Sequence, residues 1–189
     1  MDGNPAYQDE AWEELIDGKT VSMAPAGTNH VFVSGHIYKL FANYLEGKRC
    51  TPIAEGVTVY LTEKDHFVPD FMVVCDPDKI RHDGVHGAPD LAVEVLSPST
   101  AARDKRYKKS VYAQCGVKEY WIVSQRERSV EQYVLSGGTL ELQDVYTEYP
   151  DYMLEKMSEA EKASLVTEFR CTLFEDLSLK LQDIFYRVW

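Results

Sequence analysis

The chain has 189 residues, of which 44% are hydrophobic and 27% charged, values typical of one globular domain with a substantial core. Its longest apolar runs have the length of strands, which excludes a transmembrane helix and predicts no membrane partner. The net charge of −11 argues against non-specific binding of nucleic acid, because such binding depends on Lys and Arg neutralising phosphates.

The cysteines and the N-terminus suggest a cellular compartment. The N-terminal segment has neither the basic region nor the apolar core of a signal peptide. The four cysteines are widely spaced, without a CxxC pair: Cys50, Cys75, Cys115 and Cys171. This spacing argues against a zinc knuckle and predicts four reduced, mostly buried thiols in a cytoplasmic protein.

The N-terminal part of the chain predicts a β-hairpin followed by a helix. Asp17-Gly18 is a strong signal for a two-residue turn. Strands are expected on either side of it, at residues 12–16 and 20–23. Thr28 or Asn29 can cap a helix that runs to about residue 46, where Gly47 ends it.

The middle of the chain predicts strands, one loop and a second helix. Short apolar runs bounded by Pro, Gly and Asp indicate strands at residues 51–54, 57–61, 68–74 and 91–96. Residues 76–88 are polar and contain glycine, which predicts a loop. The segment 97–100 offers a cap for a helix over about 101–115, which Gly116 ends.

The last third predicts more strands and a C-terminal extension. Strands are expected at residues 119–123, 130–135 and 139–145, with Gly137-Gly138 turning the last pair. An acidic helical pattern covers about 151–161, and short apolar segments follow over 166–185. The chain therefore predicts a single α/β domain over 1–189, with a core over about 12–145 and an extension over about 151–189.

Two predicted strands carry a carboxylate among apolar residues. Asp70 opens the strand at 68–74, and Glu94 lies in the middle of the strand at 91–96. Removing a charge from water costs several kcal/mol unless the charge is paired, hydrogen-bonded or bound to a cation. Because the two strands are expected to be neighbours, they predict a divalent-metal site formed by Asp70 and Glu94.

The second predicted helix brings a lysine to the same place. Residues at spacings of three and four share one helical face, and this puts Asp104 and Lys108 on the side that packs on the sheet. An exposed i,i+4 ion pair is the simpler explanation for the two. On an inward face, Lys108 is better explained as reaching toward Glu94 and Asp70.

Two carboxylates and an amine are the groups that metal-dependent phosphodiester hydrolysis requires. The carboxylates hold Mg²⁺ or Mn²⁺, which polarises the phosphate and lowers the pKa of the attacking water. A nearby lysine stabilises the transition state or orients the water. The sequence has no G-x-S-x-G motif, and no cysteine has an evident histidine partner, so a serine or cysteine nucleophile is disfavoured.

These residues stand within motifs that resemble the Uma-two family of restriction-endonuclease-like proteins, a branch of the PD-(D/E)XK nuclease superfamily. The resemblance covers about residues 12–135 in the right order. Its pieces include Glu14-Leu15-Ile16-Asp17-Gly18, Asn29-His30, Val68-Pro69-Asp70, Gly87 to Ser99, Asp104 with Lys108 and Tyr112, and Gly116 to Trp121. The resemblance implies a restriction-endonuclease-like core: a central mixed sheet flanked by helices, with the site at one edge.

The resemblance also implies residue roles. Asp70 corresponds to the aspartate of the PD motif and Glu94 to its second acid. The superfamily motif has a lysine two residues after that acid, where this chain has Leu96. The matching lysine of this family lies in the following helix, at Lys108, the position that helical phase also selects.

Further candidates surround this core. Glu14 alternates with apolar neighbours in the predicted hairpin, which favours a catalytic role over an exposed acid. His30 is a candidate for substrate contact or for helix capping, and Asp90 ranks below both. The basic run of Arg103, Lys105, Arg106 and Lys109 predicts a phosphate-binding patch, with a solvated helix face as the alternative. His82 and His86 lie in the predicted loop without a further close ligand, which disfavours a zinc site.

Three functional hypotheses follow. The first is a Mg²⁺- or Mn²⁺-dependent endonuclease acting on DNA, with no organic cofactor. The second is a binding or regulatory module that keeps the nuclease fold without effective catalysis, which the missing motif lysine and the net negative charge support. The third is a structural homodimer whose carboxylates only satisfy buried hydrogen bonds. A homodimer is also expected under the first hypothesis, because restriction-type enzymes often dimerise to cut two strands.

Overall fold

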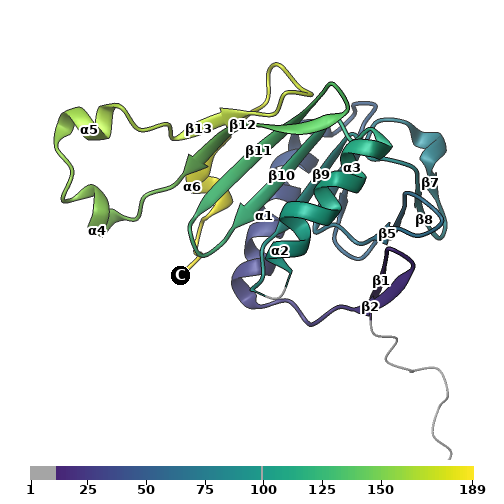
Figure 1. Ribbon diagram of the computed structural model, residues 1–189. Coiled ribbons are helices and arrows are strands. Elements are labelled where there is room, and N and C mark those ends of the chain that lie inside the picture. Colours follow the sequence, from purple (N-terminus) through teal and green to yellow (C-terminus); the bar gives the residue numbers. More distant parts are fainter. Residues whose placement is uncertain (1–11, 99) are drawn as a thin grey trace, which may run out of the picture.

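The computed structural model describes residues 12–98 and 100–189. Its centre is a six-stranded sheet in the order β12-β11-β10-β9-β6-β3 (Figure 1). The parallel pair β9–β10 sits beside antiparallel pairs, so the predicted mixed sheet is confirmed. The strands span β3 (Thr51–Ala54), β6 (Phe71–Val74), β9 (Leu91–Val95), β10 (Glu119–Ser124), β11 (Ser129–Ser136) and β12 (Thr139–Thr147).

A second sheet of short strands lies beside the first, in the order β2-β1-β5-β4-β8-β7. These strands are β1 (Glu13–Ile16), β2 (Lys19–Ser22), β4 (Val59–Tyr60), β5 (His66–Phe67), β7 (Ile80–Arg81) and β8 (Gly84–His86). The predicted N-terminal hairpin is confirmed. Asp17 and Gly18 both adopt positive φ, 50° and 72°, as the tight turn between β1 and β2 requires.

The loop predicted over residues 76–88 is wrong. This segment forms a short 3₁₀ helix, η1 (Pro77–Lys79), followed by β7 and β8. The backbone N–H of Val85 donates to Thr58 O, and that of Gly87 donates to Tyr60 O, each at 2.9 Å. The segment is polar because β7 is an exposed edge strand, and the sequence pattern of an edge strand resembles that of a loop.

Helix α1 (Thr28–Leu45) covers one face of the central sheet (Figure 1). Its apolar stripe, which includes the fully buried Val33, Ile37 and Phe41, packs against β6, β9 and β10 in the largest core cluster. The helix begins after Gly27 without a side-chain cap. The cap expected from Thr28 or Asn29 is therefore wrong, although the extent of the helix is close to the prediction.

The second helical segment packs on the opposite face (Figure 1). It consists of α2 (Ala101–Arg103), a π-helical stretch η2 (Asp104–Lys108) and α3 (Lys109–Cys115). Val111 and Tyr112 bury against this side of the sheet. Gly116, at φ 89°, ends the helix as predicted. The wider π turn keeps both ionisable residues at its ends, Asp104 and Lys108, buried.

The C-terminal extension has two parts. Helices α4 (Asp151–Leu154) and α5 (Glu159–Ala163) have no buried residues and form an arm that projects from the body (Figure 1). The segment after the arm returns to the core through β13 (Glu168–Arg170), β14 (Ser178–Lys180) and α6 (Leu181–Ile184). The buried carboxylate of Glu119 anchors this return, because it accepts a hydrogen bond from Thr172 N at 2.8 Å.

The prediction of four reduced cysteines is wrong for two of them. Cys50, directly before β3, and Cys75, directly after β6, form a disulfide. The antiparallel register that sets Thr51 opposite Val74 also brings these two side chains together, so pairing in the fold overrides their separation in the sequence. Cys115 and Cys171 remain thiols. The cytoplasmic location that the prediction supported stays a prediction.

In the described part of the chain, residues 12–98 and 100–189, no helix combines the length and the apolar character that crossing a membrane requires.

Candidate active site

Three carboxylates line up across neighbouring strands of the central sheet. Continuing the registers of the β3–β6 and β6–β9 pairings by one residue puts Glu55 beside Asp70, and Asp70 beside Glu94. Cross-strand neighbours have Cβ atoms about 5 Å apart. The strand pairing therefore brings together one acid that lies just past β3, one just before β6 and one within β9.

Asp70 is held on several sides. It is buried, its backbone N–H donates to Val93 O at 3.1 Å, and its Oδ2 accepts a hydrogen bond from Val95 N at 2.6 Å. Its Oδ1 lies 2.8 Å from His30 Nε2, in the first turn of α1. Burial lowers the pKa of His30, but the hydrogen bond and the charge of Asp70 outweigh it and raise that pKa above 6.5.

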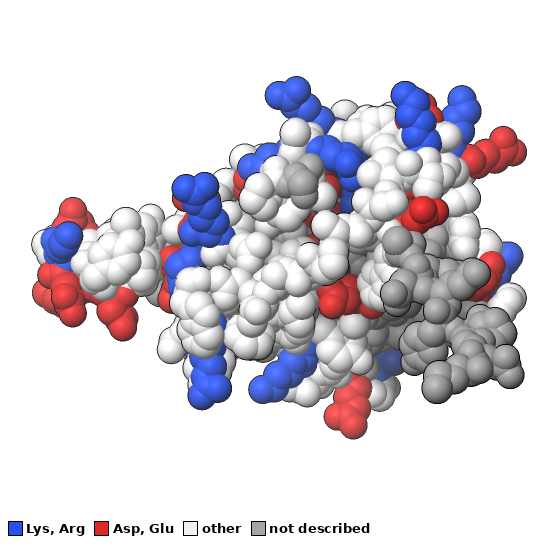
Figure 2. All heavy atoms as spheres, turned by 90° about the horizontal axis from the view of Figure 1, so that it is seen from below, with Lys and Arg blue, Asp and Glu red and all other residues white. Residues whose placement is uncertain are grey.

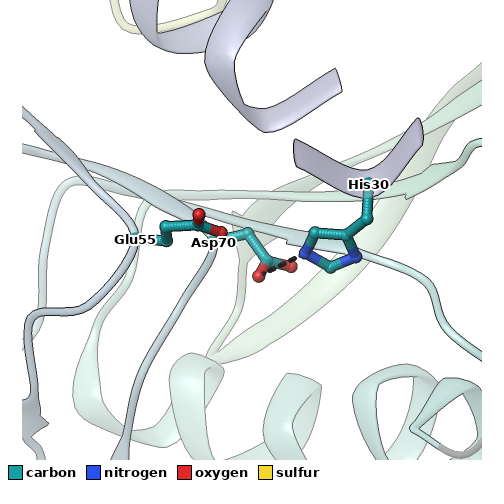
Figure 3. A group of neighbouring side chains, drawn as sticks. All are labelled: His30, Glu55 and Asp70. Carbon is teal, nitrogen blue, oxygen red and sulfur yellow. Dashed lines mark hydrogen bonds and ion pairs between the residues drawn. The ribbon is translucent and has the colours of Figure 1, made fainter. Parts of the chain in front are cut away.

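His30, Glu55 and Asp70 form a group that could hold a metal ion. Each offers one ligand atom, and the three atoms lie within 4.8 Å of one another. Figure 3 shows Asp70 between the other two, with His30 reaching in from α1. One imidazole nitrogen and two carboxylate oxygens form a donor set that suits a divalent cation. The chemistry of these residues therefore fits the predicted metal.

Glu94 points from β9 toward the second helical segment. Residues alternate along this strand, so that Leu91, Val93 and Val95 face α1 while Glu94 faces the second helical segment. Its Oε1 accepts hydrogen bonds from Lys108 Nζ at 3.0 Å and from Tyr112 OH at 2.9 Å. Burial raises the pKa of Glu94 well above its usual value, and nearby carboxylates add to this although Lys108 opposes it.

Lys108 lies at the centre of a carboxylate cluster. Its Nζ is 2.7 Å from Glu14 Oε1, 3.0 Å from Glu94 Oε1 and 3.7 Å from Asp104 Oδ1, and all four side chains are buried. Burial lowers the pKa of Lys108, but these carboxylates outweigh it and raise that pKa above its usual value. Lys108 therefore carries a positive charge at neutral pH.

The β1–β2 hairpin positions Glu14. The side chain is 2% exposed, and its Oε1 also accepts a hydrogen bond from Val68 N at 2.9 Å. Arg103 approaches from the solvent side, with its guanidinium nitrogen 3.8 Å from Glu14 Oε2. Glu14 therefore links the second sheet, the strand leading to Asp70 and the helix carrying Lys108.

Negative charge exceeds positive charge in this region. Lys108 compensates part of the cluster, and Arg103 and His30 contribute at its margin. The acids are Glu14, Glu55, Asp70, Glu94 and Asp104. Among the described residues, Asp104 Oδ1 is also a buried oxygen without a hydrogen-bond donor. An added cation would relieve this imbalance.

The basic residues of the second helical segment contact different parts of the molecule. Arg103 points to the site, whereas Lys105 pairs with Glu131 on β11. Lys109 lies 4.4 Å from the ring centre of Tyr133, also on β11. Arg106 is exposed, and among the described residues Arg103 is the member of the run with an ion pair to the carboxylate cluster.

The structure also contains a cleft of about 520 Å³. It lies at the carboxyl ends of the parallel strands β9 and β10, a common place for ligands in α/β folds. Its polar lining includes Asn29, which adjoins His30, and Ser97, Ser124, Gln125, Arg126 and Arg128.

The sequence matches the Uma2 family, described as "Putative restriction endonuclease", over residues 5–162. The chain belongs to this family. It is 31% identical over 122 residues to an uncharacterized protein of Synechocystis sp., and this match spans 64% of each chain. It is 27% identical over 128 residues to a second uncharacterized protein of the same organism, and this match spans 66% of this chain and 72% of the relative.

A solved structure resembles this Uma2 chain in fold. It is the crystal structure of a "putative nuclease belonging to DUF820" from Anabaena variabilis, with a TM-score of 0.65 and 18% sequence identity. The similarity covers 95% of this chain and 92% of that one. The resemblance expected from the sequence motifs and the restriction-endonuclease-like fold are thus confirmed.

The remaining candidates take structural positions in this Uma2 fold. Asp90 accepts hydrogen bonds from Cys75 N and Lys118 Nζ, each at 2.7 Å, and so fixes the entry to β9. His86 Nε2 lies 3.1 Å from Asp83 Oδ1, and among the described residues neither belongs to a group of three potential metal ligands. Trp121 is fully buried, as expected for a core residue.

Sequence reasoning missed Glu55. It lies one residue past the predicted strand at 51–54 and directly before Gly56, where a carboxylate resembles any polar loop residue. The signal that could have found it is the pairing of β3 with β6. That pairing was not predicted, because the sequence gives the positions of strands and not their partners.

Proposed function

We propose that this chain is a divalent-metal-dependent endonuclease that hydrolyses phosphodiester bonds in DNA, with Mg²⁺ or Mn²⁺ as cofactor. The observation that supports this best is the burial of Asp70, Glu94 and Lys108, with Glu94 and Lys108 in direct contact. Family membership and the nuclease-like fold support a nuclease in general. The residues of the site suggest how the reaction is divided among them.

Asp70 and Glu94 are the proposed ligands of the cation. When bound, the cation polarises the phosphate and lowers the pKa of the attacking water. Asp70 is well placed for this role, because Val95 N and His30 already fix the orientation of its carboxylate. Glu94 is fixed in turn by Lys108 and Tyr112. Ligands that are oriented in advance cost little reorganisation when the substrate arrives.

Lys108 is the proposed positive group of the site. Since its pKa is raised, it is a poor proton acceptor at neutral pH and acts instead by stabilising the negative charge that develops on the phosphate. Glu14 is proposed to take part in catalysis by holding this ammonium in place, with its own carboxylate oriented by Val68 N.

DNA is the proposed substrate, and its phosphates would follow the cleft at the ends of β9 and β10. His30 lies 2.8 Å from Asp70, Arg103 lies 3.8 Å from Glu14, and Arg126 lines the cleft. On the face shown in Figure 2, some acidic side chains lie near the centre, and basic and acidic side chains are mixed around the rim. A homodimer, with one site for each strand, is part of the proposal.

The alternative is a nuclease-fold module that binds nucleic acid or protein without effective catalysis. Two observations favour it. Lys108 already contacts three carboxylates, which weakens the field it offers to a phosphate. The net charge of −11 opposes the approach of DNA. These observations make a direct test of cleavage necessary.

The test is cleavage of supercoiled plasmid by the purified 189-residue chain. We expect nicking with Mg²⁺ or Mn²⁺ and none with Ca²⁺ or a chelator. Lys108→Met, which removes the charge but keeps most of the length, should reduce the rate about 10²-fold or more. Lys105→Met is the matched control on the same helix, because its partner is Glu131 outside the cluster, and it should change the rate less than about threefold.

The outcomes separate the hypotheses. Equal losses in the two lysine variants would contradict the role of Lys108 and leave a general phosphate-binding patch. Metal binding without cleavage of single- or double-stranded DNA or RNA, over a broad range of targets, would favour the binding module. Absence of both would overturn the endonuclease proposal.

A further inference from the structure

We propose that Glu55 is a ligand of the cation, so that His30, Glu55 and Asp70 hold it from three separate elements. This inference rests on the proposed function, because it extends the metal site of that proposal beyond the two strand carboxylates. It assigns a role to a residue that no sequence motif singled out. It also shifts the centre of the site toward α1 and β3.

The position of Glu55 in the fold supports its assignment as a ligand. Glu55 follows β3 directly, and the β3–β6 register sets it beside Asp70. Gly56 follows at φ 97°, and a Cβ at that residue would lie 2.4 Å from the ring of Trp12. Only glycine allows both this backbone conformation and the close approach of the ring. The turn that aims Glu55 is therefore fixed by packing.

Among the described residues, Glu55 has no Lys or Arg partner, which also supports the assignment. Within residues 12–98 and 100–189, the buried acids Glu14 and Glu94 pair with Lys108, and Asp90 pairs with Lys118. Glu55 is partly buried, and among the described residues no Lys or Arg forms an ion pair with it. A carboxylate that is drawn partly out of water beside a second carboxylate is costly without a cation.

The distances between the three candidate ligand atoms also support the assignment. The atoms offered by His30, Glu55 and Asp70 lie within 4.8 Å of one another. Ligands about 2.1 Å from one ion are at most about 4.2 Å apart, so small side-chain movements are enough to bring all three into contact with it. The three donors approach from α1, the end of β3 and the start of β6 (Figure 3).

The donor set also indicates which cation is favoured. Imidazole is a better ligand for Mn²⁺ and later transition metals than for Mg²⁺ or Ca²⁺, which prefer oxygen. A site with one nitrogen and two carboxylates should therefore bind Mn²⁺ more tightly than Mg²⁺. Together with Glu94, proposed above as a ligand, these three would make four protein ligands, which leaves coordination positions open for phosphate oxygens.

The experiment measures binding of Mn²⁺ itself, through the loss of the free-ion signal in electron paramagnetic resonance. The unaltered chain is compared with Glu55→Gln, which keeps the shape of the side chain and removes its charge. Glu63→Gln is the matched control, since Glu63 is exposed and changes the net charge equally. We expect Glu55→Gln to weaken Mn²⁺ binding about tenfold, or about 1.4 kcal/mol, and Glu63→Gln to leave it within about twofold.

Asp70→Asn, which should abolish binding, distinguishes the two levels of the proposal. If Asp70→Asn abolishes binding but Glu55→Gln binds like Glu63→Gln, the role of Glu55 is wrong and the metal-dependent function stands. If the unaltered protein binds no Mn²⁺, both proposals are wrong. If Mn²⁺ binding depends on Glu55 but no nucleic acid is cut, the ligand assignment stands and the nuclease activity does not. Thermal melting of each variant confirms that it is folded.

Discussion

At the scale of single residues, the site is a place where the fold tolerates unfavourable charge. Glu94 is 4% exposed and has Asp70, Glu14 and Asp104 as acidic neighbours, with Lys108 as its cationic partner. A core of this size would gain stability from an apolar residue at position 94. Residues that reduce stability in this way persist most often because they perform a function.

The charge imbalance around Glu94 predicts how the stability of the protein depends on pH. Burial, reinforced by its acidic neighbours and opposed by Lys108, raises the pKa of Glu94 well above 4.5 in the folded state, so the folded protein retains a proton that the unfolded chain releases. The free energy of unfolding should therefore fall as the pH rises from about 4.5 through the raised pKa. Glu94→Gln cannot titrate, so the metal-free variant should gain stability over the unaltered protein between pH 5 and pH 8.

Urea denaturation with a chelator at the two pH values measures the difference. Glu63→Gln, at an exposed position, is the control for the loss of one negative charge. A Glu94→Gln variant that is less stable at pH 8 than at pH 5, relative to the unaltered protein, would mean that Lys108 overcompensates the burial of the carboxylate. The same variant should show no cleavage.

At the scale of elements, the paired strands β3 and β6 connect a disulfide to the candidate site. The disulfide between Cys50 and Cys75 closes one end of the ladder, and Glu55 and Asp70 lie at the other. The ladder is four residue pairs long, so the disulfide limits how far the two strands can separate. Its effect on the two carboxylates is indirect, through the alignment of the strands.

Replacing both cysteines by serine should therefore act mainly on stability. Closing a loop of this length with a disulfide contributes about 3 kcal/mol, and we expect a loss of about 2–4 kcal/mol in the free energy of unfolding of Cys50→Ser/Cys75→Ser. Reduction of the unaltered protein should give a similar loss. Denaturant titration with and without a reductant measures it, and Cys115→Ser is the control for a half-buried thiol. An unchanged stability would show that the disulfide does not form in solution.

The elements also show what the sequence could and could not predict. Strand 91–95 and the helix near 101–115 were predictable because apolar periodicity is local, and helical phase selected Lys108. The π turn over Asp104–Lys108 was not predictable, since it depends on packing of two ionisable side chains. Glu55 and the disulfide depend on which strands pair. Pairing is a property of the whole sheet and leaves no mark in either strand alone.

At the scale of the whole molecule, the body and the arm have different roles. The arm formed by α4 and α5 contributes no buried residue, and all proposed site residues precede it. The segment after the arm is part of the body. Its buried apolar side chains join the core beneath α1: Phe169, Leu177, Leu179, Leu181, Ile184 and Phe185. Burying such side chains contributes about 1.5–3 kcal/mol each, so this segment should stay attached even when the arm is cut.

Limited digestion with trypsin tests this division. Lys156 is exposed in the arm, and exposed segments without packed side chains are cut first. We expect the first cut after Lys156, and the two fragments should co-purify and bind Mn²⁺ within about twofold of the intact chain. Dissociation of the fragments, or loss of Mn²⁺ binding, would mean that the arm supports the body.

The same digestion tests the proposed homodimer: if a second copy covers the exposed Tyr152 and Met153, cleavage should slow as protein concentration rises, because the cut site is then buried in the dimer.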